Sequence, residues 1–262
     1  CEGTSHKWRS SKEQFECTFC KFRTTLKSGT MLENSKLPFR YWYIAVHLMS
    51  STKKGFSAHE MRRQIGHKRY EPIWNMMHKI RRSMGNGMRD LSLKGMVELD
   101  DAYVTTHTTA KEKLKTKRGK GSTRKSKITV FAESTPLEID NKIEKACGKF
   151  YMNLNTSESA ESIDQLVKQR VSPDAVLFTD HSKAYVNLSS LVEQHLKQLS
   201  SDGQDFVYWV HIAISNLKRN ILGVYHFVKQ EYLQNYLDEF VYKLNQRKKK
   251  CIFNQVIVDL IG

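Results

Sequence analysis

The chain has 262 residues, and its 43 lysines and arginines exceed its 27 aspartates and glutamates, which gives a formal net charge of +16. A hydrophobic content of 39% is enough to build a core and excludes a wholly disordered chain. No run approaches the roughly 18–20 apolar residues of a membrane-spanning helix, so the composition predicts a soluble intracellular protein.

The positive charge is concentrated in two places. Residues 1–95 carry +12 and the run 111–127 carries +8, whereas the rest of the second part of the chain carries −4. A lysine or arginine that neutralises a phosphate releases counterions, so a basic region of this size typically binds a polyanion. The alternative is a charged face that only keeps the protein soluble.

The first segment, residues 1–34, contains a pattern typical of zinc sites. Cys17 and Cys20 are separated by two residues, and Cys1 lies 16 positions before Cys17. Zn²⁺ takes four nitrogen or sulfur ligands, and two such cysteine pairs about 15–20 residues apart build a zinc ribbon. We expect Cys1 to be the second cysteine of an upstream pair, in a sequence that starts inside a longer reading frame, with His6 as a weaker substitute ligand. A redox pair or incidental thiols is the alternative.

Residues 35–92 show helical periodicity. A first helix starts at Phe39, and Ser57-Ala-His-Glu60 is a capping box that opens a second helix ending near Gly66. A third helix combines an apolar stripe with a cationic remainder: Tyr70, Ile73, Trp74, Met77 and Ile80 in the stripe, His78, Lys79, Arg81 and Arg82 outside it. The pattern favours a helix-turn-helix-like DNA-binding region, although a plain three-helix bundle would give the same stripe.

Residues 93–262 combine strand and helix patterns. Alternating or continuous apolar runs predict strands over 96–104, 127–132, 149–154 and 175–180. Amphipathic spacing predicts helices over 157–171, 210–222 and 231–246. This order predicts an α/β fold in which helices pack on a mixed sheet.

Two aspartates occupy unusual places in these strands. Asp100 lies inside one apolar strand, and Asp180 closes another. A buried carboxylate is costly unless it is paired with a cation or a metal, and neighbouring strands can bring two carboxylates close enough to share divalent ions. An aspartate at a strand end is also often a simple loop cap.

Several sequence blocks resemble those of bacterial insertion-sequence transposases of the ISXO type. The blocks are VELDDAYV (97–104), FTDHSKAY (178–185), WVHIAISNLKR (209–219), LGVYH (222–226) and YLQNYLDEF (232–240) followed by NQR (245–247). The resemblance implies a zinc ribbon, a helical DNA-binding region and an RNase H-like catalytic domain. It also implies a protein of the bacterial cytoplasm that acts on the nucleoid.

The family's catalytic residues can be carried over by position. The resemblance makes Asp100 and Asp180 the first two catalytic residues and ranks Asp101 below Asp100. It assigns the third position to Asn216, 36 residues after Asp180, where most DDE transposases have glutamate and a branch of the resembled family has asparagine. This implies either a working Asp-Asp-Asn site for Mg²⁺ or Mn²⁺, which would cleave DNA and transfer strands, or a disabled site.

The resemblance also implies partners. Double-stranded DNA, as element terminal repeats and target, is the expected partner, bound by a homo-oligomer. A basic loop over 106–127 is expected to track DNA, and Lys218 and Arg219 to hold phosphates near the site. The loop cations are Lys111, Lys113, Lys115, Lys117, Arg118, Lys120, Arg124 and Lys125. The alternatives are a non-catalytic DNA-binding protein, a decayed transposase, or an RNase H-like nuclease that does not join strands.

Overall fold

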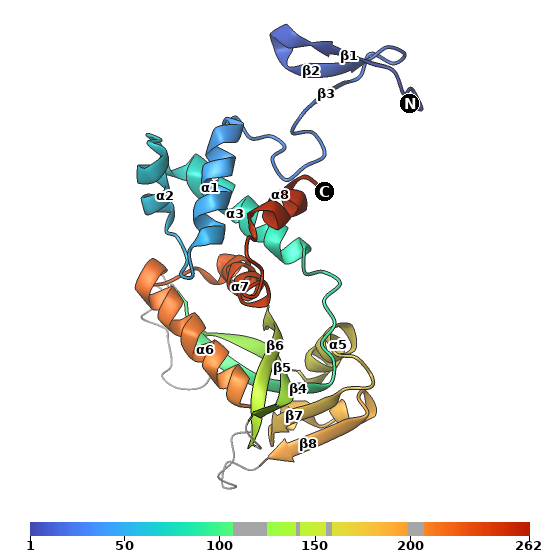
Figure 1. Cartoon of the computed structure of the whole chain (residues 1–262), viewed down its shortest axis with the longest axis vertical. Helices are drawn as coiled ribbons and strands as arrows, with labels where there is room; N and C mark the ends of the chain where they lie inside the picture. The colour runs from blue at the N-terminus through green and yellow to red at the C-terminus, as the bar shows by residue number, and fades with distance from the viewer. Residues whose placement is uncertain (107–124, 140–141, 156–158, 199–206) are drawn as a thin grey trace. The chain divides into compact units, whose positions relative to one another are not determined.

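The computed structural model describes residues 1–106, 125–139, 142–155, 159–198 and 207–262. These residues form two compact units. The first unit comprises Cys1–Thr52, Phe56–Gly87 and Cys251–Gly262, and the second comprises Lys53–Gly55 and Met88–Lys250 (Figure 1). None of the described helices is long and apolar enough to span a membrane.

The first unit begins with a small antiparallel sheet. Its strands, in the order β1-β2-β3, are β1 (His6–Arg9), β2 (Gln14–Cys17) and β3 (Arg23–Thr25). Trp8 pairs with Phe15 across β1 and β2, and their ring centroids lie 4.7 Å apart. Every residue of β1 is exposed, so this sheet has almost no core of its own. Folds this small usually depend on a metal or disulfides.

Four helices form the rest of the first unit. They are α1 (Phe39–Ser51), α2 (Ala58–Ile65), α3 (Tyr70–Asn86) and α8 (Phe253–Ile261). The predicted capping box is confirmed, since Ser57 Oγ accepts a 3.1 Å hydrogen bond from the Glu60 N–H. Gly66 ends α2 with φ +74°, a left-handed conformation that glycine adopts without steric cost.

Helix α8 comes from the far end of the sequence but belongs to the first unit. The Met31 N–H donates to the Leu260 carbonyl at 2.9 Å, and the rings of Tyr43 and Phe253 stack with centroids 6.3 Å apart. The observed division therefore differs from the predicted domain over 93–262. Because α8 is amphipathic, it buries its apolar side against the helices of the first unit.

The second unit is built on a five-stranded mixed sheet with the order β6-β5-β4-β7-β8. The strands are β4 (Met96–Thr105), β5 (Lys125–Ile139), β6 (Lys142–Leu154), β7 (Val176–Asp180) and β8 (Gln194–Gln198). Strands β4, β5 and β6 pair antiparallel, whereas β4, β7 and β8 pair parallel. The predicted α/β class with a mixed sheet is confirmed.

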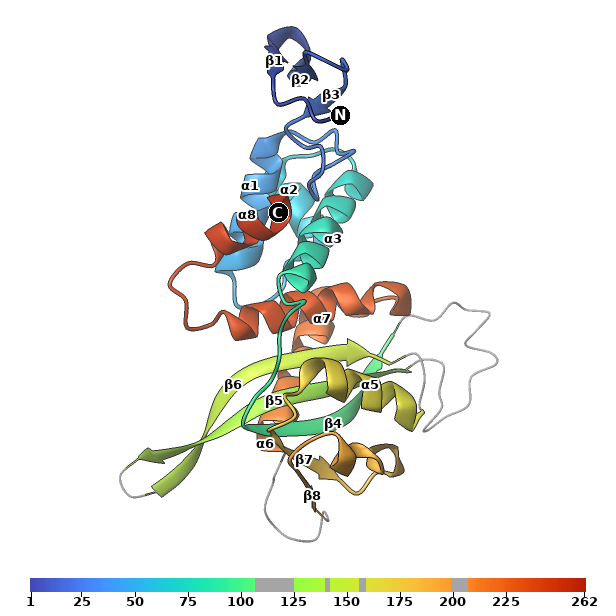
Figure 2. The same cartoon turned by 90° about the vertical axis from the view of Figure 1, so that its right-hand side faces the viewer.

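Helices cover both faces of this sheet (Figure 2). Helix α5 (Ala160–Arg170) packs on one face, where its Ile163 and Val167 join Val97 and Leu99 of β4 in a buried core. Helix α6 (Tyr208–Asn220) contacts β4 and β5, and a π-helical turn, Ile221–Tyr225, continues it. Because side chains alternate along a strand, residues 98 and 100 of β4 face α6 and residues 97, 99 and 101 face α5.

Helix α7 (Gln230–Asn245) runs beside the edge strand β6. Asn245 accepts from the Phe150 N–H at 2.7 Å and donates to the Phe150 carbonyl at 2.9 Å. Further along β6, Gln234 accepts from the Leu154 N–H at 2.8 Å and donates to the Met152 carbonyl at 3.2 Å. These amide side chains satisfy the open hydrogen-bonding groups of β6, which protects the sheet from adding another strand.

Candidate active site

The two predicted aspartates lie side by side on the sheet. Strands β4 and β7 run parallel, and their last paired residues are Leu99 and Thr179. Asp100 and Asp180 are the next residue of each strand. Neighbouring strands are about 4.8 Å apart, and residues in register on parallel strands share a face. The topology therefore brings both carboxylates to one spot, facing α6.

Asp100 is held between hydrogen-bond donors and a second acid. Its Oδ1 accepts the Asp101 N–H at 2.7 Å, and its Oδ2 lies 3.3 Å from His211 Nε2. Burial raises the pKa of Asp100, and the charge of Asp180 adds to this rise, while the Asp101 N–H and His211 oppose it. A bound divalent cation would relieve the repulsion between the two carboxylates, so this donor set fits such an ion.

A buried glutamate positions the helix that carries His211. Glu98 is fully buried, two residues before Asp100 on the same face of β4. Its Oε2 accepts the Trp209 N–H at 2.7 Å and the Val210 N–H at 3.1 Å. A carboxylate at a helix N-terminus is stabilised by the free N–H groups and the helix dipole. Glu98 thus fixes the start of α6, so that the next residue, His211, lies over Asp100.

Asn216 lies elsewhere on α6. It follows His211 by five residues, which at about 100° per residue places it roughly 140° around the helix. Its side chain is exposed, and within the described part of the chain it has no hydrogen bond to either aspartate. Lys218 follows His211 by seven residues, about two turns, and therefore shares the face of His211. Arg219 is also exposed.

The loop after β7 fixes Asp180. Its Oδ1 accepts the Ser182 N–H at 2.9 Å, and its carboxylate is otherwise exposed. Thr179 Oγ1 donates to the Asp180 carbonyl at 2.9 Å and lies 2.8 Å from His195 Nε2. Burial lowers the pKa of His195 to about 4, so this imidazole is neutral at pH 7. The backbone around Asp180 is therefore held by a neutral hydrogen-bond network.

Asp101 points to the opposite face of β4 and is already paired. Lys127 Nζ lies 2.9 Å from its Oδ2, with only 13% and 14% of the two side chains exposed, and Thr129 Oγ1 donates to its Oδ1. Asp101 adds to the effect of burial in raising the pKa of Tyr185. The charge of Asp101 is thus neutralised within the sheet itself.

The predicted basic loop over 106–127 ends earlier in the sequence than expected. Strand β5 starts at Lys125, two residues before the predicted strand, and so extends back into the basic run, where Lys127 forms an ion pair inside the sheet. Lys125 is exposed at the start of β5. The other predicted DNA-tracking cations lie outside the described residues: Lys111, Lys113, Lys115, Lys117, Arg118, Lys120 and Arg124.

The three N-terminal cysteines converge as the zinc prediction requires. The sulfur atoms of Cys1, Cys17 and Cys20 all lie within 4.8 Å of one another, and the Cys1–Cys20 separation is 3.0 Å. Backbone N–H groups of Cys20 and Phe19 lower the pKa of the Cys17 thiol, which favours the thiolate that zinc binds. A Cβ on Gly3 would lie 3.0 Å from the Cys17 sulfur, so the chain wraps closely around the cluster.

Comparison with known proteins identifies the second unit. The model of the ISXO2-like transposase domain matches residues 92–245, which span the five-stranded sheet and helices α5, α6 and α7. A search of curated proteins found no match. The family match and the mixed sheet flanked by helices confirm the predicted RNase H-like fold class.

Proposed function

This chain belongs to the ISXO2-like transposase family, and on that basis we propose that it cleaves and joins DNA strands at the ends of an insertion sequence. The observation that carries the proposal is the pairing of Asp100 and Asp180 at the ends of neighbouring parallel strands, with His211 of α6 against Asp100. Two carboxylates and an imidazole facing one spot form a donor set for divalent cations.

We propose Asp100, Asp180 and His211 as the residues that hold these cations. Asn216 was the predicted third ligand, and that prediction gains no support from the contacts of α6. His211 is favoured because it is the next residue after the N–H groups that Glu98 binds, and it contacts Asp100 directly. Imidazole is a better ligand for transition metals than for Mg²⁺, so we expect Mn²⁺ to support activity more strongly than Mg²⁺.

Each side chain has a separate task in this proposal. When bound, divalent cations would activate water or a 3′-hydroxyl and neutralise the charge that develops on the departing oxygen. Lys218, on the face of His211, binds the phosphate next to the scissile bond, and Arg219 a neighbouring phosphate. Glu98 positions α6, and Asp101 supplies the N–H that orients Asp100. The chemistry needs no covalent link between protein and DNA.

The first unit is proposed to bind the element ends. Cys1, Cys17 and Cys20 would hold a structural Zn²⁺. His6, the weaker predicted substitute ligand, is not among the residues whose ligand atoms cluster with the three sulfur atoms. The helical part of this unit would contact double-stranded DNA, including the terminal repeats. Synapsis of two ends requires more than one protomer, so we propose a homo-oligomer on DNA. The site of action would be the bacterial cytoplasm and nucleoid.

A strand-joining assay tests this proposal. The purified chain is incubated with Mn²⁺, a labelled duplex that ends in the terminal sequence flanking its own gene, and a target plasmid. We expect joined products with the wild type and with Asp174→Asn, which removes an exposed aspartate outside the site, and none with Asp180→Asn. Equal joining by Asp180→Asn would refute the site. DNA binding without any joining would support the alternative of a non-catalytic DNA-binding protein, and cleavage without joining would indicate a nuclease.

A further inference from the structure

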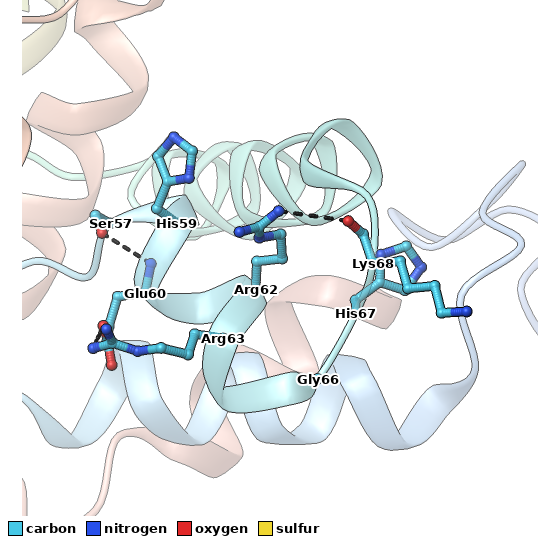
Figure 3. A pocket seen from close by; sticks show the side chains of 8 residues that line it. All are labelled: Ser57, His59, Glu60, Arg62, Arg63, Gly66, His67 and Lys68. Carbon is cyan, nitrogen blue, oxygen red and sulfur yellow. Dashed lines mark hydrogen bonds and ion pairs between the residues drawn. The ribbon is translucent and has the colours of Figure 1, made fainter.

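A surface hollow lies where α2 turns into α3. Figure 3 shows the side chains of α2 and of the turn that follows it arranged around this hollow. The lining residues are Ser57, His59, Glu60, Arg62, Arg63, Gly66, His67 and Lys68. All of them belong to the first unit, far along the chain from the aspartates on β4 and β7.

The amphipathic pattern of α2 creates this surface. Ala58, Met61 and Ile65 are buried, and their spacing of three and four residues forms a single stripe that faces the other helices. The remaining face of the helix is polar and points to solvent. The cations of α2 are therefore displayed on the surface and do not contribute to the core.

Two of the hollow's cations are available to a ligand. Glu60 is occupied, because Arg63 forms an ion pair with it and Gln64 donates to it at 2.8 Å. Arg62 makes a long 3.5 Å hydrogen bond to the Lys68 carbonyl, which draws the guanidinium towards the turn (Figure 3). Of the carboxylates that the structure describes, none pairs with Arg62 or Lys68.

The backbone of the turn repels an anion less than an open helix C-terminus would. The Gly66 and His67 N–H groups donate to the Arg62 carbonyl at 3.0 and 3.1 Å, closing α2 in a Schellman-type turn. These bonds occupy a carbonyl group at the C-terminal end of α2, where free carbonyls would otherwise repel an anion. The turn thus places two cations beside a helix C-terminus whose partial negative charge is reduced by these hydrogen bonds.

Helix α3 offers much less positive surface than its sequence indicates. Arg81 is buried, with its guanidinium 3.5 Å from the Phe56 carbonyl, and Lys79 Nζ donates to the Glu33 carbonyl at 2.5 Å. The charged residues that remain exposed on this helix are Glu71 and Arg82, whose charges cancel. Of the cations that predicted a recognition helix, Arg81 and His78 are therefore buried, Lys79 is partly buried, and Arg82 stays exposed.

We propose that the hollow binds a phosphate of the DNA backbone through Arg62 and Lys68, and that the first unit grips DNA mainly at this turn and not along α3. This inference rests on the proposed function, because it takes DNA as the partner. Guanidinium and ammonium groups are the usual donors to phosphate oxygens. A phosphate contact positions the protein on the duplex without reading sequence, so base recognition would come from other residues.

The test is DNA binding by the full chain, measured by fluorescence anisotropy on a labelled duplex without divalent metal. The double variant Arg62→Gln/Lys68→Gln is compared with the double variant Arg40→Gln/Arg82→Gln, which removes the same net charge from exposed arginines of α1 and α3 in the same unit. We expect Arg62→Gln/Lys68→Gln to bind at least about tenfold more weakly at 100 mM salt, with a salt-dependence slope lower by about 1 to 2. The charge-matched control should lose less than about threefold. Lys68→Gln alone should show part of the effect.

Two outcomes would overturn the inference. If Arg82→Gln alone weakens binding as much as Arg62→Gln/Lys68→Gln, α3 is the principal contact, and if Arg40→Gln/Arg82→Gln weakens it as much, only net charge matters. Unfolding midpoints in urea establish that the variants are folded. Strand joining by the wild type and Asp180→Asn decides the proposed function separately, because the hollow could fail while joining persists.

Discussion

Asp100 and Asp101 are neighbours in sequence but lie on opposite faces of β4, in opposite electrostatic situations. Asp101 has a lysine 2.9 Å away and a threonine hydroxyl donor, so the protein itself neutralises its charge. Asp100 has a second acid nearby and a half-exposed histidine at 3.3 Å, and its pKa is raised by burial and by Asp180. On the Asp101 face a lysine of the protein neutralises the carboxylate. On the Asp100 face two carboxylates lie close together, and a bound cation would be needed to neutralise them.

This contrast separates stability from function. A protein that only needed a folded sheet would gain nothing from placing two acids on neighbouring strands, because their repulsion opposes folding. Such an arrangement is typical of sites that bind cations. Substitutions on the two faces should therefore have different consequences.

The largest expected effect is on activity. Replacing Asp100 with asparagine should lower the rate of strand joining by more than about a hundredfold, since a ligand for the metal is lost. The same change should leave the free energy of unfolding unchanged or slightly higher, because it removes a charge that burial and Asp180 disfavour. Joining rates and urea unfolding measure the two quantities. A large loss of stability would mean that Asp100 is a structural charge like Asp101.

The next effect is on stability. Lys127→Met leaves Asp101 as an unpaired buried charge, which should lower the free energy of unfolding by about 3 kcal/mol. The double variant Asp101→Asn/Lys127→Met removes both charges and should recover most of that loss. Urea unfolding of the three proteins at pH 7 measures this. If Lys127→Met is as stable as the wild type, the ion pair does not stabilise the sheet.

A third prediction distinguishes two residues of α6. His211→Ala should lower joining by about 10- to 100-fold and should reduce the preference for Mn²⁺ over Mg²⁺. Asn216→Ala should change the rate less than about threefold, because its side chain points away from the aspartates. The reverse ranking would restore Asn216 as the third ligand. Rates are compared in both metals at equal DNA occupancy.

The smallest expected effect concerns Asp238, a partly buried aspartate of α7. Burial raises its pKa to about 6, although Gln234 and Arg170 oppose the rise. A carboxyl whose folded pKa is raised stabilises the fold fully below its unfolded pKa of about 3.8, and this contribution is lost as the pH rises through 6. Asp238→Asn should therefore raise the free energy of unfolding at pH 7.5 by about 1 to 2 kcal/mol.

The control for this prediction is the pH dependence. Asp238→Asn and the wild type should converge near pH 3, below the unfolded pKa of about 3.8, where Asp238 is largely protonated in both the folded and the unfolded chain. Urea unfolding at several pH values between 3 and 8 gives the difference. A constant difference across that range would show that the substitution acts through the Gln234 hydrogen bond and not through the charge.

The sequence was sufficient to predict the sheet class, the capped helix at Ser57 and the two aspartates on neighbouring strands. Each of these features follows from a local sequence pattern, such as the alternation of apolar residues in a strand or an aspartate at its end. It did not predict β8, because Gln194–Gln198 is a polar edge strand whose pairing with β7 is visible only in three dimensions. Nor did it assign α8 to the first unit, since nothing local says which core an amphipathic helix joins.

The candidate site was predicted less completely. Glu98 was missed, although its place two residues before Asp100 puts both on one face, because a buried glutamate can cap a helix that is distant in sequence. The choice between His211 and Asn216 depends on the rotation of α6 about its axis, which Glu98 sets. Helical periodicity gives the relative phase of residues but not the direction in which a stripe faces.

The central claim is that the Asp100 face, and not the Asp101 face, binds the divalent cation. Mn²⁺ binding to the full chain, followed by electron paramagnetic resonance of the free ion, tests it most directly. We predict that the wild type and Asp101→Asn/Lys127→Met bind Mn²⁺ with equal affinity, and that Asp100→Asn binds at least about tenfold more weakly. Retained affinity in Asp100→Asn, or lost affinity in the folded double variant, would contradict the account.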